Sequence, residues 1–433
     1  MKEARNKNAF DGVRNSPYYQ GKMDLWYLFG CKALDLVKDN GSVSFIATNN
    51  WITSFGASKF RNKVNDEAKF KYFIDFGNYK AFDTASIQTM IYLMTKDSTE
   101  ENYYFNYSKL LVDTISDDNL KLFLYTHNAT DIYEKFVSGF NRVSNKDSYF
   151  NFMEKNKSDL FNKITSLDSI TYLKKSEIST GIDVHQDKLN RKGSEKINLP
   201  IGSGIFVISD IEKDALSLSS NELGLIKPYL TTEELFRYFS NKNNKEWVIY
   251  TKSDINDKIN NYPNIKKHFD KFSEVITSDN KPYGLHRARN EKIFTSEKII
   301  VTRKCIIPTF SYANFDAYVS QTFMIINSKR FNLKFLTGLL NSKLIQFWLK
   351  YKGKMQGNNY QLDKEPLQKI PIITDIDDNI EKNIIMLVEN ILQEYESNFE
   401  FPNIELLENE LNNLIYELYE ITEDEIKLIE ESL

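Results

Sequence analysis

The sequence has few of the residues that build disulfide-stabilised, metal-binding or membrane proteins. Of its 433 residues only Cys31 and Cys305 are cysteines, so no disulfide framework is available beyond one bridge, and no Cys/His group has the spacing of metal ligands. No apolar run approaches the ~18 residues of a transmembrane helix, and the polar start MKEARNKNAF is unlike a signal peptide. We therefore expect a protein of the reducing cytoplasm, with no metal and no membrane segment.

Basic residues are almost missing from the C-terminal end. Residues 375–433 contain 18 Asp and Glu but only 2 Lys, which gives this segment a net charge of −16. Since the whole chain has a net charge of −4, the rest of the chain carries +12. A basic body is typical of nucleic-acid binding proteins, and the acidic end has the pattern of solvated helices.

The first 96 residues predict the back half of an α/β sheet. Apolar residues recur at helical spacing over 24–38 and 54–64. Runs rich in β-forming residues predict three strands, over 42–48, 70–76 and 87–94. The last two strands are joined by a short loop and could form an antiparallel pair at the edge of the sheet.

The remaining residues predict three further regions. Residues 97–170 are rich in Asn, Asp, Lys and Ser and are expected to be a connecting region, partly helical. Residues 171–373 alternate short strands with turns, interrupted by a helix over 331–351, as in an α+β domain. Residues 374–433 predict acidic C-terminal helices, a hairpin of 378–397 and 403–432 with Pro402 between them.

Two blocks near the N-terminus resemble a known family. The segments KMDLWYLFGCKALDLVKDNGSVSFIATNNWITS (22–54) and FIDFGNYKAFDTASIQTMIYLM (73–94) are similar to the second half of the catalytic domain of TaqI-like and type IIG adenine-N6 DNA methyltransferases. The resemblance implies a Rossmann-like sheet over residues 1–96 and an enzyme of a restriction–modification system.

Blocks further along resemble the same family's DNA target-recognition domain. They are GIDVH (181–185), LIKPYL (225–230), the stretch 299–326 and LLNSKLIQFWLKYKGKMQGNNYQLDKEPLQKIPI (339–372), followed by a C-terminal helix like LNNLIYELYEITEDEIKLIEE (411–431). The resemblance implies that 171–373 is a target-recognition domain whose partner is double-stranded DNA.

The sequence departs from the family where methyl transfer is performed. The complete enzymes bind S-adenosyl-methionine with a Gly-rich turn after their first strand, and this chain has no such G-x-G; Gly202-Ser203-Gly204 precedes a strand and lies far downstream. The family's N-P-P-Y motif has only a weak look-alike here, Asn15-Ser16-Pro17-Tyr18, which can also be an ordinary turn. We therefore expect no cofactor for this chain alone and a complementary N-terminal methyltransferase half as a partner.

Two residues are candidates for the target-base pocket. Phe82 lies where the family places an aromatic ring against the extruded adenine, and the alternative is a loop aromatic that packs against the sheet edge. Asn49 follows a strand at its carboxyl end, where α/β sheets place ligands, and the alternative is a turn or helix cap.

Two clusters are candidates for DNA contact. The stretch 281–304 contributes His286, Arg287, Arg289, Arg303 and Lys304, and Arg287 and Arg289 share a face if the segment is extended. The stretch 352–361, expected to be a loop, contributes Lys352, Lys354, Asn358, Asn359 and Tyr360. Solvated surface charge is the alternative for both.

Three functions remain open. The first is the DNA-recognition and base-pocket portion of an adenine methyltransferase that needs its other half. The second is a stand-alone, sequence-specific DNA-binding module without catalysis. The third is an interaction protein that has lost DNA binding, which the +12 body argues against.

Overall fold

The computed structural model describes residues 7–82, 87–126, 128–356, 359–399 and 401–433. The chain forms two compact units, Met1–Lys163 and Ile164–Leu433, each described by itself. Within the described residues, no helix is both long enough and apolar enough to cross a bilayer.

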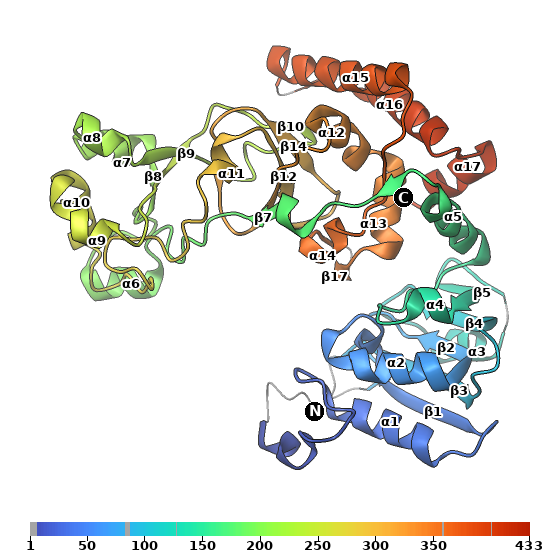
Figure 1. The fold of residues 1–433 in the computed structure, drawn as a ribbon. Helices are drawn as coiled ribbons and strands as arrows, with labels where there is room; N and C mark the ends of the chain where they lie inside the picture. Colours follow the sequence, from blue (N-terminus) through green and yellow to red (C-terminus); the bar gives the residue numbers. More distant parts are fainter. Residues whose placement is uncertain (1–6, 83–86, 127, 357–358, 400) are drawn as a thin grey trace. The chain divides into compact units, whose positions relative to one another are not determined.

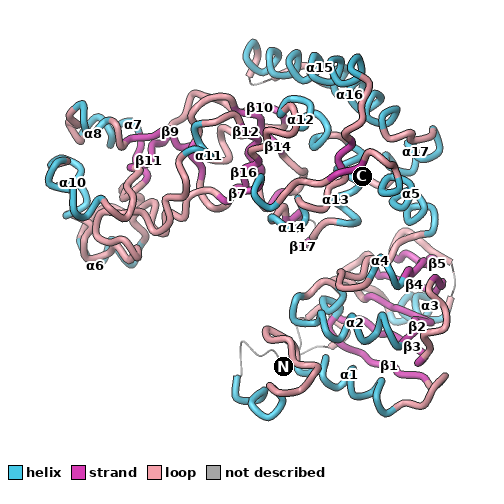
Figure 2. The backbone as a smooth tube through the Cα atoms, viewed as in Figure 1, coloured by secondary structure: helices cyan, strands magenta, loops and turns pink. Residues whose placement is uncertain are grey.

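Unit 1 is built on a five-stranded mixed sheet in the order β1-β3-β2-β4-β5. Its strands are β1 (Ser42–Thr48), β2 (Ala68–Asp75), β3 (Thr89–Lys96), β4 (Asn102–Leu110) and β5 (Tyr133–Asn141). Its helices are α1 (Leu25–Leu36), α2 (Ser58–Glu67), α3 (Asp117–Tyr125) and α4 (Arg142–Asn145), and α5 (Lys155–Ser166) follows. Figures 1 and 2 show α1 and α2 lying side by side.

The elements predicted for residues 24–94 are confirmed, with one change in their order. Strands β2 and β3 pair antiparallel as expected, but β3 also pairs with β1 and so lies inside the sheet. The reason lies in its residues: Met90, Tyr92 and Met94 are fully buried on one face, and Ile91 and Leu93 are half-buried on the other. A strand that is apolar on both faces suits an interior position.

The stretch 97–170 holds more strand than the sequence reading anticipated. Strand β4 pairs parallel with β2, and β5 pairs antiparallel with β4, so both extend the sheet. Tyr103, Phe105 and Tyr107 of β4 are buried and alternate with more exposed residues, which is the two-residue period of a half-buried strand.

The two faces of this sheet are covered unequally. Helices α1 and α2 pack over one face around Trp51 and Phe60, whose rings lie 4.7 Å apart. On the opposite face, Phe123 of α3 packs with Phe76, at one end only. The rest of that face carries exposed apolar side chains, namely Ile46, Tyr72, Tyr104 and Val137. These four apolar side chains of the second face are therefore exposed to solvent.

Unit 2 contains four small sheets. Their orders are β10-β14-β12-β16-β7, β15-β9-β11-β8, β13-β18-β17 and β19-β6. The strands are β6 (Ile170–Thr171), β7 (Ile178–Thr180), β8 (Val207–Ser209), β9 (Ile226–Leu230), β10 (Tyr238–Phe239), β11 (Glu246–Ile249), β12 (Lys298–Thr302), β13 (Lys304–Cys305), β14 (Phe310–Ala313), β15 (Tyr318–Val319), β16 (Phe323–Ile326), β17 (Met355–Gln356), β18 (Asn359–Gln361) and β19 (Ile372–Ile373).

Helices flank these sheets (Figure 1). They are α6 (Arg191–Ile197), α7 (Asp210–Ala215), α8 (Ser220–Leu223), α9 (Ile255–Lys258), α10 (Pro263–Asp270), α11 (Lys292–Thr295), α12 (Leu333–Asn341), α13 (Lys343–Lys352), α14 (Lys364–Leu367), α15 (Asp378–Ser397), α16 (Glu405–Leu418) and α17 (Glu423–Glu431). Helix α15 packs against α12 and α16, and Gly338 lets them approach, because a Cβ there would lie 2.9 Å from Val388.

Two predicted helices are each divided in the structure. The helix expected over 331–351 breaks at Ser342, whose extended backbone and hydroxyl cap α13, while the side chain of Asn341 bonds to the backbone of Phe310. The helix expected over 403–432 breaks after Leu418, because Glu420 has φ +55° and Thr422 starts a new capping box.

Candidate nucleic-acid interface

Within the stretch 352–361, where a loop was expected, Met355–Gln356 (β17) and Asn359–Gln361 (β18) form two antiparallel strands. Strand β17 pairs with β18, and β18 pairs with β13, which sets Lys304 opposite Gln361 and Cys305 opposite Tyr360. This small sheet joins the end of the first basic cluster to the second one. The two DNA-contact candidates, which lie about 50 residues apart in sequence, therefore meet in space.

Arg303 connects the two basic segments through hydrogen bonds. Its Nη2 and Nε donate to Oδ1 of Asp363 at 2.5 and 2.9 Å, and its Nη1 donates to the carbonyl of Gln321 at 2.8 Å. Lys354 approaches the other oxygen of the same carboxylate at 4.0 Å. A guanidinium held on both sides by its own chain is a structural clamp, so Arg303 positions its neighbours and has no free fork for a base.

The same contacts continue to the other end of the first cluster. Gln321 donates from Nε2 to Oδ1 of Asp183 at 3.0 Å, and Oδ2 of Asp183 lies 3.9 Å from Nε2 of His286. The ring of His286 stacks on His185, with centroids 4.9 Å apart, and its Nδ1 accepts from the backbone N–H of Asp279. A continuous polar path thus runs from His286 to Lys354.

Two cations beside this path have no competing partner. Arg287 pairs through its backbone with Asp183, and its exposed side chain makes no hydrogen bond or ion pair with any residue that the structure describes. The exposed side chain of Lys304 is equally unpaired among those residues. We call His286, Arg287, Arg303, Lys304 and Lys354 the basic surface.

Two other candidates are revised by their surroundings. Arg289 does not share a face with Arg287, because its φ of +70° ends the extended run and its Nε donates to the carbonyl of Gly181 at 3.1 Å. Tyr360 is only 5% exposed, so its ring packs inside the protein and cannot stack on a base.

The remaining candidates of the second cluster lie around β17 and β18. Lys352 is exposed in the last turn of α13, and Asn359 is half-buried at the start of β18. Asn358 lies outside the described residues. The sequence reading missed Gln321 and Asp363, which hold the basic surface together; Asp363 closely follows β18, but nothing in its neighbours indicated which arginine it would meet.

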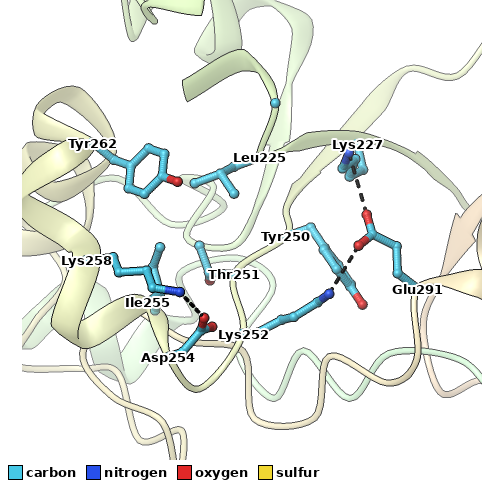
Figure 3. A pocket seen from close by; sticks show the side chains of 11 residues that line it. Leu225, Lys227, Tyr250, Thr251, Lys252, Asp254, Ile255, Lys258, Tyr262 and Glu291 are labelled. Atoms are coloured by element: carbon cyan, nitrogen blue, oxygen red, sulfur yellow. Dashed lines mark hydrogen bonds and ion pairs between the residues drawn. The ribbon is translucent and has the colours of Figure 1, made fainter. Parts of the chain in front are cut away.

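A separate hollow of about 310 Å³ lies between the strands β9 and β11 and the helix α9 (Figure 3). Each lysine that lines it has an anionic partner within the protein. Lys227 and Lys252 lie 3.6 and 3.2 Å from the two oxygens of Glu291, and Lys258 pairs with Asp254. Three lysines against two carboxylates leave the lining with one positive charge in excess, but every one of these lysines already has an anionic partner.

In unit 1 the sheet brings Asn49 and Asp75 together at one edge. Asn49 begins the 3-10 helix Asn49–Ile52 after β1, and its Nδ2 donates to Oδ1 of Asp75, the last residue of β2, at 2.9 Å. The same oxygen accepts from the N–H of Gly77. The Oδ1 of Asn49 accepts no hydrogen bond from any described residue, which leaves one amide acceptor at the carboxyl end of β1.

Phe82 lies in the loop between β2 and β3 and is 45% exposed. Its ring belongs to neither of the two apolar clusters of described residues in unit 1. The next residues, 83–86, lie outside the described part of the chain. An exposed aromatic ring beside the strand ends has the geometry of a stacking surface.

The tetrapeptide Asn15–Tyr18 is a turn. It follows the 3-10 helix Lys7–Val13 and no strand, and Asn15 and Pro17 are exposed. The hydroxyl of Tyr18 donates to the carboxylate of Asp35 on α1, and this hydrogen bond raises the pKa of Tyr18. Tyr18 therefore fastens the N-terminal segment to α1 and is not directed to a base.

The turn Gly202-Ser203-Gly204 does not fit S-adenosyl-methionine. The one glycine pair, Gly202 and Gly204, has its amides occupied: Gly202 donates to Leu189, Ser203 to Pro200, and Gly204 to Oε1 of Glu212 at 2.7 Å. The N–H groups of this turn already donate to acceptors within the protein, and one of these acceptors is a carboxylate. The turn therefore offers no cradle for a ligand. Among the described residues there is also no group of three metal-binding side chains.

Two family models match parts of the chain. Residues 1–82 match the Eco57I restriction-modification methylase, and residues 227–372 match the TaqI-like C-terminal specificity domain. The second range contains all five residues of the basic surface. The predicted resemblance to a restriction-modification methylase and to a TaqI-like specificity domain is therefore confirmed.

Curated proteins and solved structures agree with these matches. The type II methyltransferases M.HindII and M.HincII, both of Haemophilus influenzae, are 23% and 22% identical over 93% of this chain, which covers 77% and 76% of their lengths. The type IIL restriction-modification enzyme MmeI, solved in complex with DNA, matches 95% of this chain with a TM-score of 0.57 at 13% identity. The chain spans 52% of MmeI, and this likeness shows the fold.

Proposed function

We propose that this chain, which belongs to the restriction–modification methyltransferases with a TaqI-like specificity domain, binds a specific site in duplex DNA through unit 2. Unit 1 then supplies the target-base pocket of an adenine-N6 methyltransferase. A complementary N-terminal half supplies the S-adenosyl-methionine site and the catalytic motif.

The observation that carries DNA recognition is the polar path from His286 to Lys354. Arg303, Gln321 and Asp183 fix the backbone on which the unpaired Arg287 and Lys304 are displayed. Preorganised cations lose little freedom on binding, and an arginine with a free fork can read a guanine or bind a phosphate. The matched specificity domain and the DNA complex of MmeI support the same assignment.

We expect Arg287→Ala and Lys304→Ala each to weaken duplex binding by the full-length chain several-fold. If Lys304 contacts a phosphate, its loss weakens all duplexes alike and reduces the slope of log K against log salt by about one. If Arg287 reads a base, Arg287→Ala should weaken binding mainly to the duplex with the preferred sequence. Fluorescence anisotropy over a range of salt concentrations measures both.

Arg191→Ala is the matched control, because Arg191 is an exposed cation of the same unit on α6, ion-paired with Glu195. It should leave affinity and salt slope near the wild-type values. Unchanged binding by both Arg287→Ala and Lys304→Ala would show that the basic surface is ordinary solvated charge.

The base-pocket assignment rests on Phe82 and Asn49. The exposed ring of Phe82 can replace the stacking that an adenine loses when it leaves the duplex. Asn49 has a free amide oxygen that can accept a hydrogen bond from the adenine amino group. Asn49 follows the end of β1 and Phe82 lies in the loop after β2, and both belong to the residues that match a methylase family.

The need for a complementary half is supported by the uneven cover of the sheet. Ile46, Tyr72, Tyr104 and Val137 leave one face apolar and exposed, and β1 has a single strand neighbour among the described residues. Sheets of α/β enzymes bury both faces, and a bare edge strand invites pairing. A further set of strands and helices would cover this surface and bring the missing cofactor site.

We expect the chain alone to show no tight, stoichiometric binding of S-adenosyl-methionine in isothermal titration calorimetry. The physical reason is that the amides of 202–204 are already bonded within the protein. Tight binding at one site per chain would contradict the proposal that a complementary half supplies the cofactor site. This chain would then have to form that site itself.

The second candidate function is a specificity module that binds DNA without catalysis, which the misfit to S-adenosyl-methionine also allows. The exposed apolar face of unit 1 favours the first proposal, because a stand-alone module gains nothing from leaving this surface open to water.

A further inference from the structure

The connection between β12 and β14 presents two isoleucines to solvent. Ile306 is 73% exposed and Ile307 is 50% exposed, while Pro308 beside them is buried. We call Ile306 and Ile307 the tip of this connection. Adjacent β-branched apolar side chains that face water are unfavourable there and add nothing to the core. Two adjacent exposed isoleucines offer an apolar contact surface to a partner.

The tip is held firmly at its base. Val301 pairs with Phe310, and the N–H of Thr302 donates to the carbonyl of Thr309. One arm, Lys304–Cys305, pairs with β18, and on the other arm the Thr309 hydroxyl donates to the carbonyl of Ile307 at 3.1 Å. The two side chains therefore project from a preorganised support.

The tip also continues the basic surface. Ile306 is two residues from the unpaired Lys304 and three from the clamped Arg303. A duplex bound by the unpaired Lys304 would run past the tip. An apolar pair at a cationic surface matches the chemistry of a base step, which has charged phosphates outside and apolar base faces inside.

We propose that Ile306 and Ile307 form a wedge that enters a base step of bound duplex DNA and separates the stacked bases. This role rests on the proposed DNA binding of unit 2. Inserted apolar side chains unstack a step and kink the duplex, and the unstacking cost falls where the stack is already interrupted. The wedge, which belongs to unit 2, would thus help to separate stacked bases in the duplex that this unit binds.

The test compares two short duplexes that differ only in one abasic site at the centre. We expect the full-length chain to bind the abasic duplex on the order of tenfold more tightly than the intact one, because the opening already exists. The double variant Ile306→Ala/Ile307→Ala should lose this preference while keeping its affinity for the intact duplex within a few-fold. Fluorescence anisotropy with labelled duplexes measures both.

Two further variants sharpen the result. Ile306→Phe/Ile307→Phe should keep the preference, since a phenyl ring also fills an opened step. Ile211→Ala is the matched control, because Ile211 is an exposed isoleucine on α7 of the same unit and should change nothing.

The outcomes separate the inference from the function beneath it. Equal binding of both duplexes by the wild-type chain, or a preference that survives Ile306→Ala/Ile307→Ala, overturns the wedge and leaves DNA recognition standing. Failure to bind either duplex overturns the proposed function and the wedge with it. Ordinary DNA binding combined with self-association that the double variant abolishes would make the tip a protein contact and also overturn the wedge.

Discussion

Replacing Glu222 by alanine is expected to lower the free energy of unfolding of the chain by about 3–5 kcal/mol. Its carboxylate is 0% exposed and accepts from the N–H and hydroxyl of Ser219, the N–H and side-chain amide of Asn264, and the N–H of Ile265. One side chain thus satisfies the starts of α8 and α10. Without it, these donors lie unbonded around a small cavity.

The same carboxylate makes stability depend on pH in a defined direction. Hydrogen bonds from Ser219, Asn264 and Ile265 outweigh the effect of burial and lower the pKa of Glu222 to about 2, from an ordinary value of 4.5. A carboxyl whose pKa is lower in the folded chain stabilises it fully above 4.5 and loses that contribution as the pH falls toward 2. Urea unfolding at neutral pH and at successively lower pH should show this loss in the wild type.

Glu233→Ala is the control for both measurements. Glu233 lies in the same unit, is exposed, and pairs only with the exposed Lys245 and the Thr231 turn. Surface pairs of this kind contribute about 0–1 kcal/mol, so the control should unfold close to the wild type. A Glu222→Ala variant as stable as Glu233→Ala would mean that other groups satisfy the two helix starts.

The first part of the fold was predictable because its apolar pattern is continuous within each element. Helix α1 buries Tyr27, Gly30, Cys31 and Leu34 on one face, and in β1 the more buried residues Val43, Phe45 and Ala47 alternate with exposed ones, so spacing alone defines both elements. Strand β4 has the same kind of signal, since Tyr103, Phe105 and Tyr107 alternate with exposed residues. The stretch 97–170 around β4 is rich in polar residues, so the sequence predicted a connecting region there and the alternation was not recognised.

The helix breaks could not be predicted from spacing, because the apolar pattern continues through them. At Ser342 the break depends on Asn341. The side-chain amide of Asn341 forms hydrogen bonds with the backbone of Phe310 on β14, which ties the end of α12 to that strand. After Leu418 it depends on the left-handed backbone of Glu420. Both causes are tertiary or capping interactions that a hydrophobic pattern does not contain.

The candidate site was predictable as a set of basic segments but not as a geometry. Arg303 and Asp363 are 60 residues apart, and Gln321 meets Asp183 across 138 residues, so the sequence could not tell which cations would be used up by their own chain. It favoured Arg289 and Tyr360 as strongly as Arg287 and Lys304. Only the contacts separate the two that are occupied or buried from the two that are free.

The largest functional effect is expected at Phe82. Once a complementary half is present, Phe82→Ala should weaken capture of the extruded adenine by ~1–3 kcal/mol, roughly five- to hundredfold, since this is the loss for one base–aromatic stack. Phe82→Trp should be tolerated, because an indole offers at least as large a face. The ring is 45% exposed, so its removal should cost far less stability than the ~3–5 kcal/mol of a buried phenylalanine.

Two readouts separate stacking from packing. Fluorescence of 2-aminopurine at the target position reports extrusion in the complemented enzyme, and thermal unfolding of the chain reports stability. Phe55→Ala is the matched control, because Phe55 is an exposed phenylalanine of the same unit, at the start of the 3-10 helix Phe55–Ala57. A lower melting temperature for Phe82→Ala with unchanged 2-aminopurine extrusion would mean that the ring serves the fold, and Asn49 alone would then remain as a base-pocket candidate.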